Sequence, residues 1–300
     1  MKKVVVVGCG NVGMAYVNNL INSKGLVDEI VLIDKEDDRL IGEAMDLSHA
    51  AVGNNSNTKI KHGSYKDCLD ADIVVITAGK NQAVGQNRLT LVNDNKVIVR
   101  DIVRESIING FSGVFLIATN PVDIMCYVAK ETANYPSNKI IGTGTLLDTA
   151  RVKYLLSQKI KVNTENIHAY VLGEHGDSSF VVWSKSTIGM VPIKETITND
   201  DLDAIENEVR QIGYRILNKK GYTNYGEAMC LLKITKAILK DENIILNVSS
   251  PYEEIYISMP SVISKDGIKG TMKINFDEEE SLEFEHSKDV IRNAIRSMEE

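Results

Sequence analysis

The segment Gly173–Asp177 carries the residue best suited to acid–base chemistry, because His175 lies between two glycines after the apolar pair Val171-Leu172. An imidazole gains and loses a proton near neutral pH, so it can protonate a carbonyl oxygen as that carbonyl is reduced. Taken alone, one histidine among five is more often structural or solvent-exposed than catalytic. Functional residues concentrate in loops that follow buried strands, and we therefore treat His175 as a candidate general acid and base.

Asp148 and Arg151 are three residues apart in a segment with a helical pattern, so they share one face of the predicted helix. An aspartate there could orient a histidine and stabilise its charged form. An arginine could bind a substrate carboxylate with two parallel hydrogen bonds. The alternative is an ion pair between the two residues on the helix surface, and the spacing alone favours it.

A glycine-rich turn, Gly8-Cys9-Gly10-Asn11-Val12-Gly13, follows a run of valines and opens a helical pattern. In this context the first glycine makes a tight turn and the second lets the backbone approach a pyrophosphate. The third permits close helix–strand contact, and the helix N-terminus faces the phosphates. The spacing is weak on its own, but its position between a strand and a helix predicts a dinucleotide site that includes Asn11 and Val12.

Asp34 ends the next apolar run, 21 residues beyond Gly13. A carboxylate at that point binds the adenosine ribose hydroxyls and repels a 2′-phosphate, which favours NAD over NADP. The alternative is that Asp34 is a simple turn residue. Small residues at Thr77, Ala78 and Gly79 follow a third apolar run, where the backbone would approach the ribose or the nicotinamide.

The elements that must position these residues can be predicted from apolar patterns. Continuous apolar runs, typical of strands buried on both faces of a parallel sheet, occur at Val4–Val7, Ile30–Ile33, Ile73–Ile76 and Val114–Ile117. Helical patterns alternate with them at Asn11–Ile21, Asp37–Leu47, Leu91–Ile108 and Val122–Glu131. The alternation predicts the α/β class, with a Rossmann-type, doubly wound parallel sheet.

From about residue 142 the pattern changes to longer helices and then to short strands. Helices are expected at Leu146–Ser157, Leu202–Leu217, Gly226–Lys240 and Glu278–Arg296, with strands between Ile244 and Ile274. We predict a dinucleotide-binding domain over residues 1–142 and an α+β substrate domain over residues 143–300.

Composition excludes several classes of function. The 300 residues include 34 basic and 41 acidic ones, a net charge of −7 that gives no general attraction for nucleic acid or an anionic membrane. No apolar run approaches the ~20 residues of a membrane helix. The four cysteines are widely separated and no metal-ligand spacing occurs. We expect free thiols, no metal and a cytoplasmic protein.

Together these motifs resemble the lactate/malate dehydrogenase family, and within it the NAD-dependent L-lactate dehydrogenases. The resemblance covers nearly the whole chain and is carried by Gly8–Gly13, Asp34, Ala118–Asp123, Gly142–Arg151, Gly173–Asp177 and Gly221–Gly226. Each motif alone is unspecific, whereas their joint occurrence in this order is highly specific. The resemblance implies an oxidoreductase that transfers hydride between NAD(H) and a small 2-oxo or 2-hydroxy acid.

The resemblance also implies roles for individual residues. His175 corresponds to the proton donor and acceptor, Asp148 to its partner and Arg151 to the clamp for the substrate carboxylate. Arg88 resembles a mobile-loop arginine that polarises the substrate carbonyl.

Asn120 would orient substrate or His175 beside the cofactor, and Thr223 would line the substrate pocket. The family forms dimers and tetramers, so we expect a homo-oligomer and a role in glycolysis or fermentation.

Substrate choice in this family depends on one loop residue, which is an arginine in malate dehydrogenases and Gln82 here. A neutral amide leaves a second substrate carboxylate without a counter-charge, so pyruvate and lactate are the leading pair. However, Ala83-Val84 replaces the Lys-Pro pair usual in lactate dehydrogenases. The segments Gly142–Leu147 and Gly221–Thr223 also resemble L-2-hydroxyisocaproate dehydrogenase, so larger aliphatic 2-oxo acids are the main alternative. A malate dehydrogenase or a catalytically silent NAD-binding protein is less favoured.

Two further positions depart from the family pattern. Lys153 stands where many bacterial relatives carry an arginine that, with the residue matching His168, binds the activator fructose 1,6-bisphosphate between subunits. Lysine keeps the charge but loses the bidentate fork, so we expect a weaker site there. Glu227 replaces a bulky apolar residue that packs on the nicotinamide. Either its carboxylate reaches that ring, or it caps a helix with Asn224, and the capping-box-like spacing favours the cap.

Overall fold

The computed structural model describes residues 1–80 and 91–299 of the chain. The first half alternates strands and helices as the apolar runs predict. Its elements are β1 (Lys3–Val7), α1 (Asn11–Asn22), β2 (Glu29–Ile33), α2 (Asp37–Gly53), β3 (Lys59–His62), β4 (Ile73–Ile76), α3 (Val92–Ile108), β5 (Val114–Ile117), α4 (Val122–Ala133) and β6 (Ile140–Gly142). These six strands are parallel and lie in the order β6-β5-β4-β1-β2-β3, so the predicted doubly wound sheet is confirmed.

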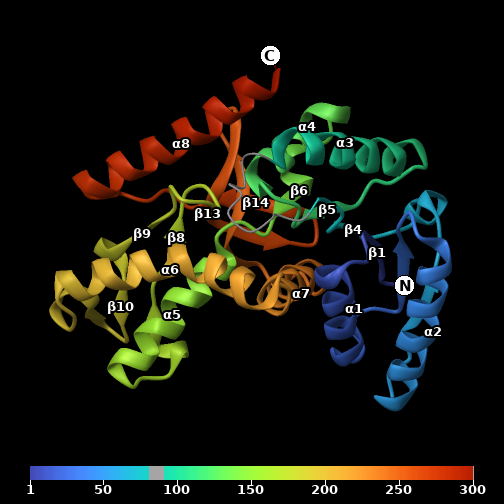
Figure 1. Cartoon of the computed structure of the whole chain (residues 1–300), viewed down its shortest axis with the longest axis horizontal. Helices are drawn as coiled ribbons and strands as arrows, with labels where there is room; N and C mark the ends of the chain where they lie inside the picture. The colour runs from blue at the N-terminus through green and yellow to red at the C-terminus, as the bar shows by residue number, and fades with distance from the viewer. Residues whose placement is uncertain (81–90, 300) are drawn as a thin grey trace.

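The second half begins with α5 and ends with α8 (Figure 1). Its elements are α5 (Leu146–Ile160), β7 (Ile167–His168), β8 (Val171–Leu172), β9 (Phe180–Val181), β10 (Thr187–Ile188), β11 (Val191–Pro192), α6 (Asn199–Lys220), α7 (Tyr225–Leu239), β12 (Ile244–Tyr252), β13 (Ile255–Ser264), β14 (Gly267–Thr271) and α8 (Glu278–Glu299). Short 3₁₀ turns cover Tyr65–Cys68, Ser137–Lys139, Thr164–Asn166, Trp183–Lys185 and Ile193–Glu195.

The strands β12, β13 and β14 do not form a sheet of their own. They continue the parallel sheet in antiparallel fashion, because β12 pairs with β6 through Ser249 and Gly142. In the described residues one sheet of nine strands therefore runs through both halves of the chain. The division after residue 142 stays a prediction.

Alternate residues of the same strands pack into two cores, one on each face of the sheet. Val5, Val74 and Phe115 face a core that includes α3, α4 and α8, whereas Val4 and Leu116 face one that includes α1, α2 and α7. This two-sided burial explains why the strands are unbroken apolar runs in the sequence. Figure 1 shows α1 and α2 on one side of the molecule and α3 and α4 on another.

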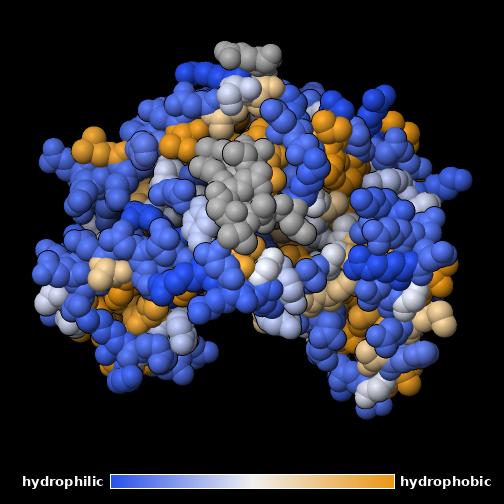
Figure 2. Space-filling view, viewed as in Figure 1, coloured by the Kyte–Doolittle hydropathy of each residue, from blue (hydrophilic) through white to orange (hydrophobic). Residues whose placement is uncertain are grey.

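Polar residues dominate the visible surface of the molecule, and the cysteine side chains are buried in its interior. The face seen in Figure 2 is mostly hydrophilic, with its apolar residues in small groups. Cys9, Cys68, Cys126 and Cys230 are buried and unpaired with one another. Within the described part of the chain, the helices are too short or too polar to span a bilayer.

Candidate active site

The glycine turn between β1 and α1 requires glycine at its first and last positions. Gly8 has a φ of +99°, and a Cβ atom on it would lie 2.2 Å from the Ala78 backbone nitrogen. A Cβ atom on Gly13 would lie 2.3 Å from the Gly8 carbonyl oxygen. Gly10 differs, because a Cβ atom there would meet nothing described within 4 Å. Its open side faces the cavity, as an approach site for a ligand requires.

Asp34 follows β2 and joins the glycine turn to the next element. Its Oδ2 accepts a hydrogen bond from the Cys9 N–H at 2.7 Å, and its Oδ1 accepts one from the Lys35 N–H at 2.7 Å. The Cys9 carbonyl in turn accepts from Arg39 Nη2 at 2.6 Å. Asp34 therefore has two tasks, since it fixes the turn and lines the same cavity.

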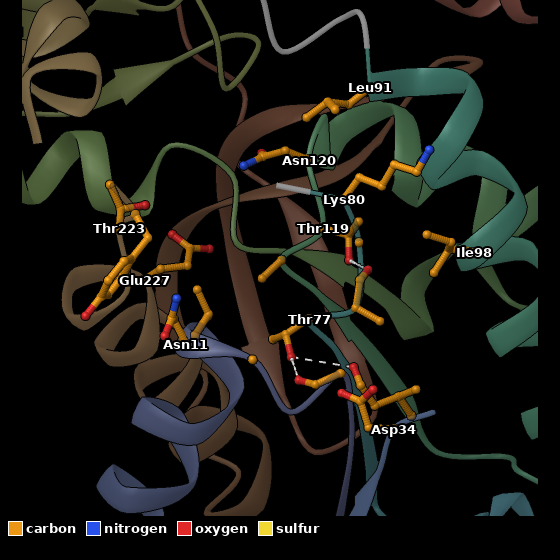
Figure 3. Close-up of a pocket in the computed structure, with 18 of the residues that line it drawn as sticks. Asn11, Asp34, Thr77, Lys80, Leu91, Ile98, Thr119, Asn120, Thr223 and Glu227 are labelled. Atoms are coloured by element: carbon orange, nitrogen blue, oxygen red, sulfur yellow. Dashed lines mark hydrogen bonds between the residues drawn. The ribbon is translucent and has the colours of Figure 1, made fainter. Parts of the chain in front are cut away.

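Thr77, Ala78 and Gly79 follow β4 and close the other side of the turn. The Thr77 hydroxyl donates to the Gly8 carbonyl at 2.5 Å, and the Ala78 N–H donates to the Val7 carbonyl at 3.0 Å. The Thr77 contact appears in Figure 3 beside Asp34 and across the cavity from Glu227. With Asn11 and Val12, these residues line the cavity.

The residues predicted to bind the dinucleotide line one cavity, except Gly13, which packs against the Gly8 carbonyl behind the turn. The N-terminus of α1 shows whether the site suits the pyrophosphate of NAD. Among the described residues no side chain caps this N-terminus, and its first turn carries no acidic residue that would repel a phosphate. An uncapped helix N-terminus behind an open Gly10 suits a pyrophosphate, and the Asp34 carboxylate suits ribose hydroxyls.

His175, Asp148 and Arg151 form one buried charge network. His175 Nδ1 lies 2.6 Å from Asp148 Oδ2, and Arg151 Nη1 lies 2.8 Å from Asp148 Oδ1. His175 and Asp148 are only 7% and 6% exposed. Both interpretations of the Asp148–Arg151 spacing therefore hold in part. The two residues form an ion pair, but the pair is buried, and Asp148 also contacts His175. Because a carboxylate only accepts hydrogen bonds, the Asp148 contact keeps a proton on Nδ1 and leaves Nε2 as the nitrogen available for proton transfer.

Asp123 is a site residue that our sequence analysis missed. Its Oδ2 accepts the His175 backbone N–H at 2.8 Å, so it fixes the main chain of the histidine loop while Asp148 fixes the ring. Burial raises the pKa of Asp123 to about 6. The signal was present, since Asp123 is the last residue of the Ala118–Asp123 motif and the acidic residue in the first turn of α4. From the other side, the Ser287 hydroxyl accepts the Glu174 N–H at 2.6 Å.

Asn120 and Thr223 line the cavity, as predicted for substrate contacts. The Asn120 side-chain oxygen is buried and has no hydrogen-bond partner among the described residues. The Asn120 carbonyl accepts from Asn95 Nδ2 at 2.7 Å, which holds that backbone in place. Gln82 and Arg88 lie outside the described residues, so their roles stay predictions.

The expected helix cap at Glu227 is wrong. Asn224 precedes α7 but its side chain makes no capping hydrogen bond in the described residues, and instead its Oδ1 accepts from Lys220 Nζ at 2.6 Å. Glu227 lines the cavity near Thr143, and burial raises the pKa of its carboxyl group. The side chain therefore faces the cavity instead of the local partner that the spacing suggested.

Lys153 and His168 lie outside the cavity. Lys153 is half-buried on α5, with its Nζ 5.9 Å from the centre of the Tyr170 ring, and burial followed by the charge of Lys233 lowers its pKa. His168 is exposed on β7, where it pairs with Thr187. The anion site at these two residues stays a prediction.

The cavity that joins these groups has a volume of about 1040 Å³. It extends from Asp34 and the glycine turn to Arg151, His175 and Glu227. The described residues include no cluster of histidine, cysteine and acidic side chains arranged to hold a metal ion. One cavity is thus lined at one end by the glycine turn and Asp34, and at the other end by the acid–base residue His175 and the guanidinium of Arg151.

Comparison with known proteins gives the same picture. The NAD binding domain of lactate/malate dehydrogenase matches residues 2–142, and the alpha/beta C-terminal domain of that family matches residues 145–300. L-lactate dehydrogenase 2 of Bacillus anthracis is 44% identical over 98% of both chains. L-lactate dehydrogenase of Geobacillus stearothermophilus is 43% identical over 98% of this chain and 96% of its own. A lactate dehydrogenase from a Medee basin deep-sea metagenome library superposes with a TM-score of 0.94 at 41% identity, covering 100% of this chain and 99% of its own.

Proposed function

The chain belongs to the lactate/malate dehydrogenase family, and we propose that it is an NAD-dependent L-lactate dehydrogenase that interconverts pyruvate and L-lactate. The observation that carries the proposal is the His175–Asp148–Arg151 network, because its members His175 and Arg151 line the same cavity as the glycine turn. Residues 1–142 would hold the cofactor, and most groups that act on the substrate would come from residues 143–300.

Each polar group has a task in reducing a 2-oxo acid. Arg151 binds the substrate carboxylate through the guanidinium hydrogens that its contact with Asp148 leaves. Protonated His175 donates from Nε2 to the carbonyl oxygen, and Asp148 stabilises the imidazolium before that transfer. When bound, NADH supplies the hydride. In the reverse direction neutral His175 takes the proton from the hydroxyl group of lactate.

Pyruvate is the proposed substrate because Gln82 stands where malate dehydrogenases carry an arginine, so this position gives a second substrate carboxylate no counter-charge. Oxidation of NADH should be measured with pyruvate, 2-oxoisocaproate and oxaloacetate, in the wild type and in Gln82→Arg. We expect the highest kcat/KM with pyruvate, and a higher oxaloacetate-to-pyruvate ratio in the variant. A preference for 2-oxoisocaproate would favour the branched-chain alternative. No turnover of any of the three, despite NADH binding, would contradict an enzymatic role.

We also propose a cytoplasmic homo-oligomer, either a tetramer or a dimer. Support for self-association comes from α2, where Ile41, Met45 and Val52 are 41%, 58% and 75% exposed. Three apolar side chains exposed along one helix favour burial against another surface. The unpaired thiols support a reducing compartment. Sedimentation equilibrium tests the assembly, and a monomer at micromolar concentration would contradict it.

A further inference from the structure

A carboxylate stands beside the acid–base centre with no task in the proposed reaction. Glu227 projects from the first turn of α7 into the cavity, and it lies close enough to His175, Asp148 and Arg151 to interact with their charges. Figure 3 shows Glu227 and Asn11 on one side of the cavity, with Thr119 and Lys80 across it. Cys230, one helical turn further along α7, is buried beside it.

The position of Glu227 relative to the cofactor follows from the reaction itself. Hydride and proton must reach the carbon and the oxygen of one carbonyl group. The nicotinamide and the His175 imidazole therefore both adjoin that group. Because Glu227 interacts with His175 and lines the cavity between it and the glycine turn, its carboxylate faces the nicotinamide end of the cofactor.

The two redox forms of the cofactor differ in charge at that end. The oxidised ring carries a positive charge and the reduced ring is neutral, while their adenosine and pyrophosphate parts are the same. A carboxylate beside the ring attracts only the oxidised form, and burial strengthens this attraction because the local dielectric constant is low. Arg151 and Asp148 carry opposite charges and bond each other, so they offset one another at this point.

We propose that Glu227 selects between the redox forms of the bound cofactor, and strengthens binding of NAD relative to NADH. The inference rests on the proposed use of NAD but not on turnover of any substrate. It assigns the carboxylate a specificity role toward the cofactor rather than a catalytic one.

Glu227→Gln is the decisive variant, because it keeps the size and shape of the side chain and removes the charge. Dissociation constants of NADH and NAD should be measured without substrate, by fluorescence titration and by competition, at pH 7 and pH 9. We expect the NAD constant to rise about tenfold and the NADH constant to change less than about twofold. Because burial raises the pKa of Glu227, this effect at pH 9 should be at least as large as at pH 7.

The matched control is Glu105→Gln, which also removes one acid from the cavity wall. Glu105 lies on α3 near Tyr65, at the Asp34 end, where the two cofactor forms are alike. Its ratio of NAD to NADH constants should equal that of the wild type. An unchanged ratio in Glu227→Gln at both pH values, or an equal shift in both constants, would overturn the proposal. Neither result would bear on pyruvate reduction, and inactivity toward all 2-oxo acids would leave these binding measurements intact.

Discussion

At the glycine turn the cavity wall consists mainly of backbone, whereas around His175 it consists of side chains that bear charge. The turn is built from neighbouring residues of one strand and one helix, and its shape depends on missing Cβ atoms at Gly8 and Gly13. The proton-transfer end brings together α4, α5 and the loop after β8 through contacts between Asp123, Asp148 and His175.

Because one end of the cavity is lined by backbone and the other by charged side chains, substitutions at the two ends should impair the protein for different physical reasons. A backbone wall is sensitive to added volume and insensitive to the pH of the solution. A wall of buried charges tolerates no lost partner, because each charge left alone carries an uncompensated desolvation cost. Substitutions at the glycine turn should therefore act through steric clash, and substitutions around His175 through the loss of a charged or proton-transferring group.

The largest effect is expected at the proton-transfer end. His175→Ala removes the group that moves the proton, and kcat should fall by about 10²–10⁴-fold, the usual contribution of a positioned acid–base group. NADH affinity should change less than about twofold, since the cofactor wall is unaltered. The exposed His286→Ala on α8 serves as the control and should retain full turnover. Near-normal kcat in His175→Ala would remove His175 from the mechanism.

At the cofactor end, Gly8→Ala should destabilise the fold by at least ~3 kcal/mol. The new methyl group meets backbone at 2.2 Å and the residue keeps a φ of +99°, so clash and strain combine. Gly25→Ala separates the two terms, because Gly25 has a φ of +72° and a Cβ atom there meets nothing described within 4 Å. It should lose only ~1 kcal/mol. Equal urea midpoints for the two variants would show that the close approach at Gly8 is unimportant.

Asp123→Asn should make stability less dependent on pH. The folded pKa of Asp123 is raised to about 6, so its protonated form stabilises the fold below about pH 4 and that contribution is lost as the pH rises through about 6. Asparagine retains an acceptor for the His175 N–H but does not titrate. Relative to the wild type, the variant should gain about 2 kcal/mol between pH 4.5 and pH 7.5. Parallel curves of unfolding free energy against pH would contradict this.

The smallest change in stability is expected at Gly10. A methyl group there has open space in the protein, so Gly10→Ala should alter the free energy of unfolding by less than ~0.5 kcal/mol. The same methyl group projects toward the place of the pyrophosphate, and NADH binding should weaken about tenfold. Unchanged NADH affinity would mean that the cofactor backbone does not approach Gly10. With Gly8→Ala, this variant distinguishes a glycine required for folding from one required for binding.

The same contrast explains what the sequence could reveal. Strands β1, β2, β4 and β5 could be predicted because burial on both faces makes them continuous apolar runs. The edge strand β3 was missed since its Lys-Ile-Lys-His sequence is solvated, and β6 was missed since it has only three residues. Turns and helix faces depend on local spacing, so Gly8–Gly13 and the Asp148–Arg151 pair could be predicted.

Contacts between distant segments carry no such signal. Asp123 and His175 are 52 residues apart, and no periodicity relates them. At Glu227 the capping-box spacing predicted a local hydrogen bond, but the side chain lines the cavity instead, and the spacing carries no information on that cavity.

Chemical labelling of the buried cysteines should measure local unfolding of this protein. Burial raises the pKa of Cys9 to about 12 and that of Cys68 to about 11, and it holds the pKa values of Cys126 and Cys230 well above the usual value. The thiolate is the reactive form of cysteine. Because the raised pKa values keep these thiols protonated, alkylating agents and peroxides should react with them very slowly in the native fold. Labelling should therefore follow transient unfolding, and Cys9 lies within the glycine turn itself. The rate at which iodoacetamide modifies Cys9 would then measure how often that turn opens, and bound cofactor should slow it.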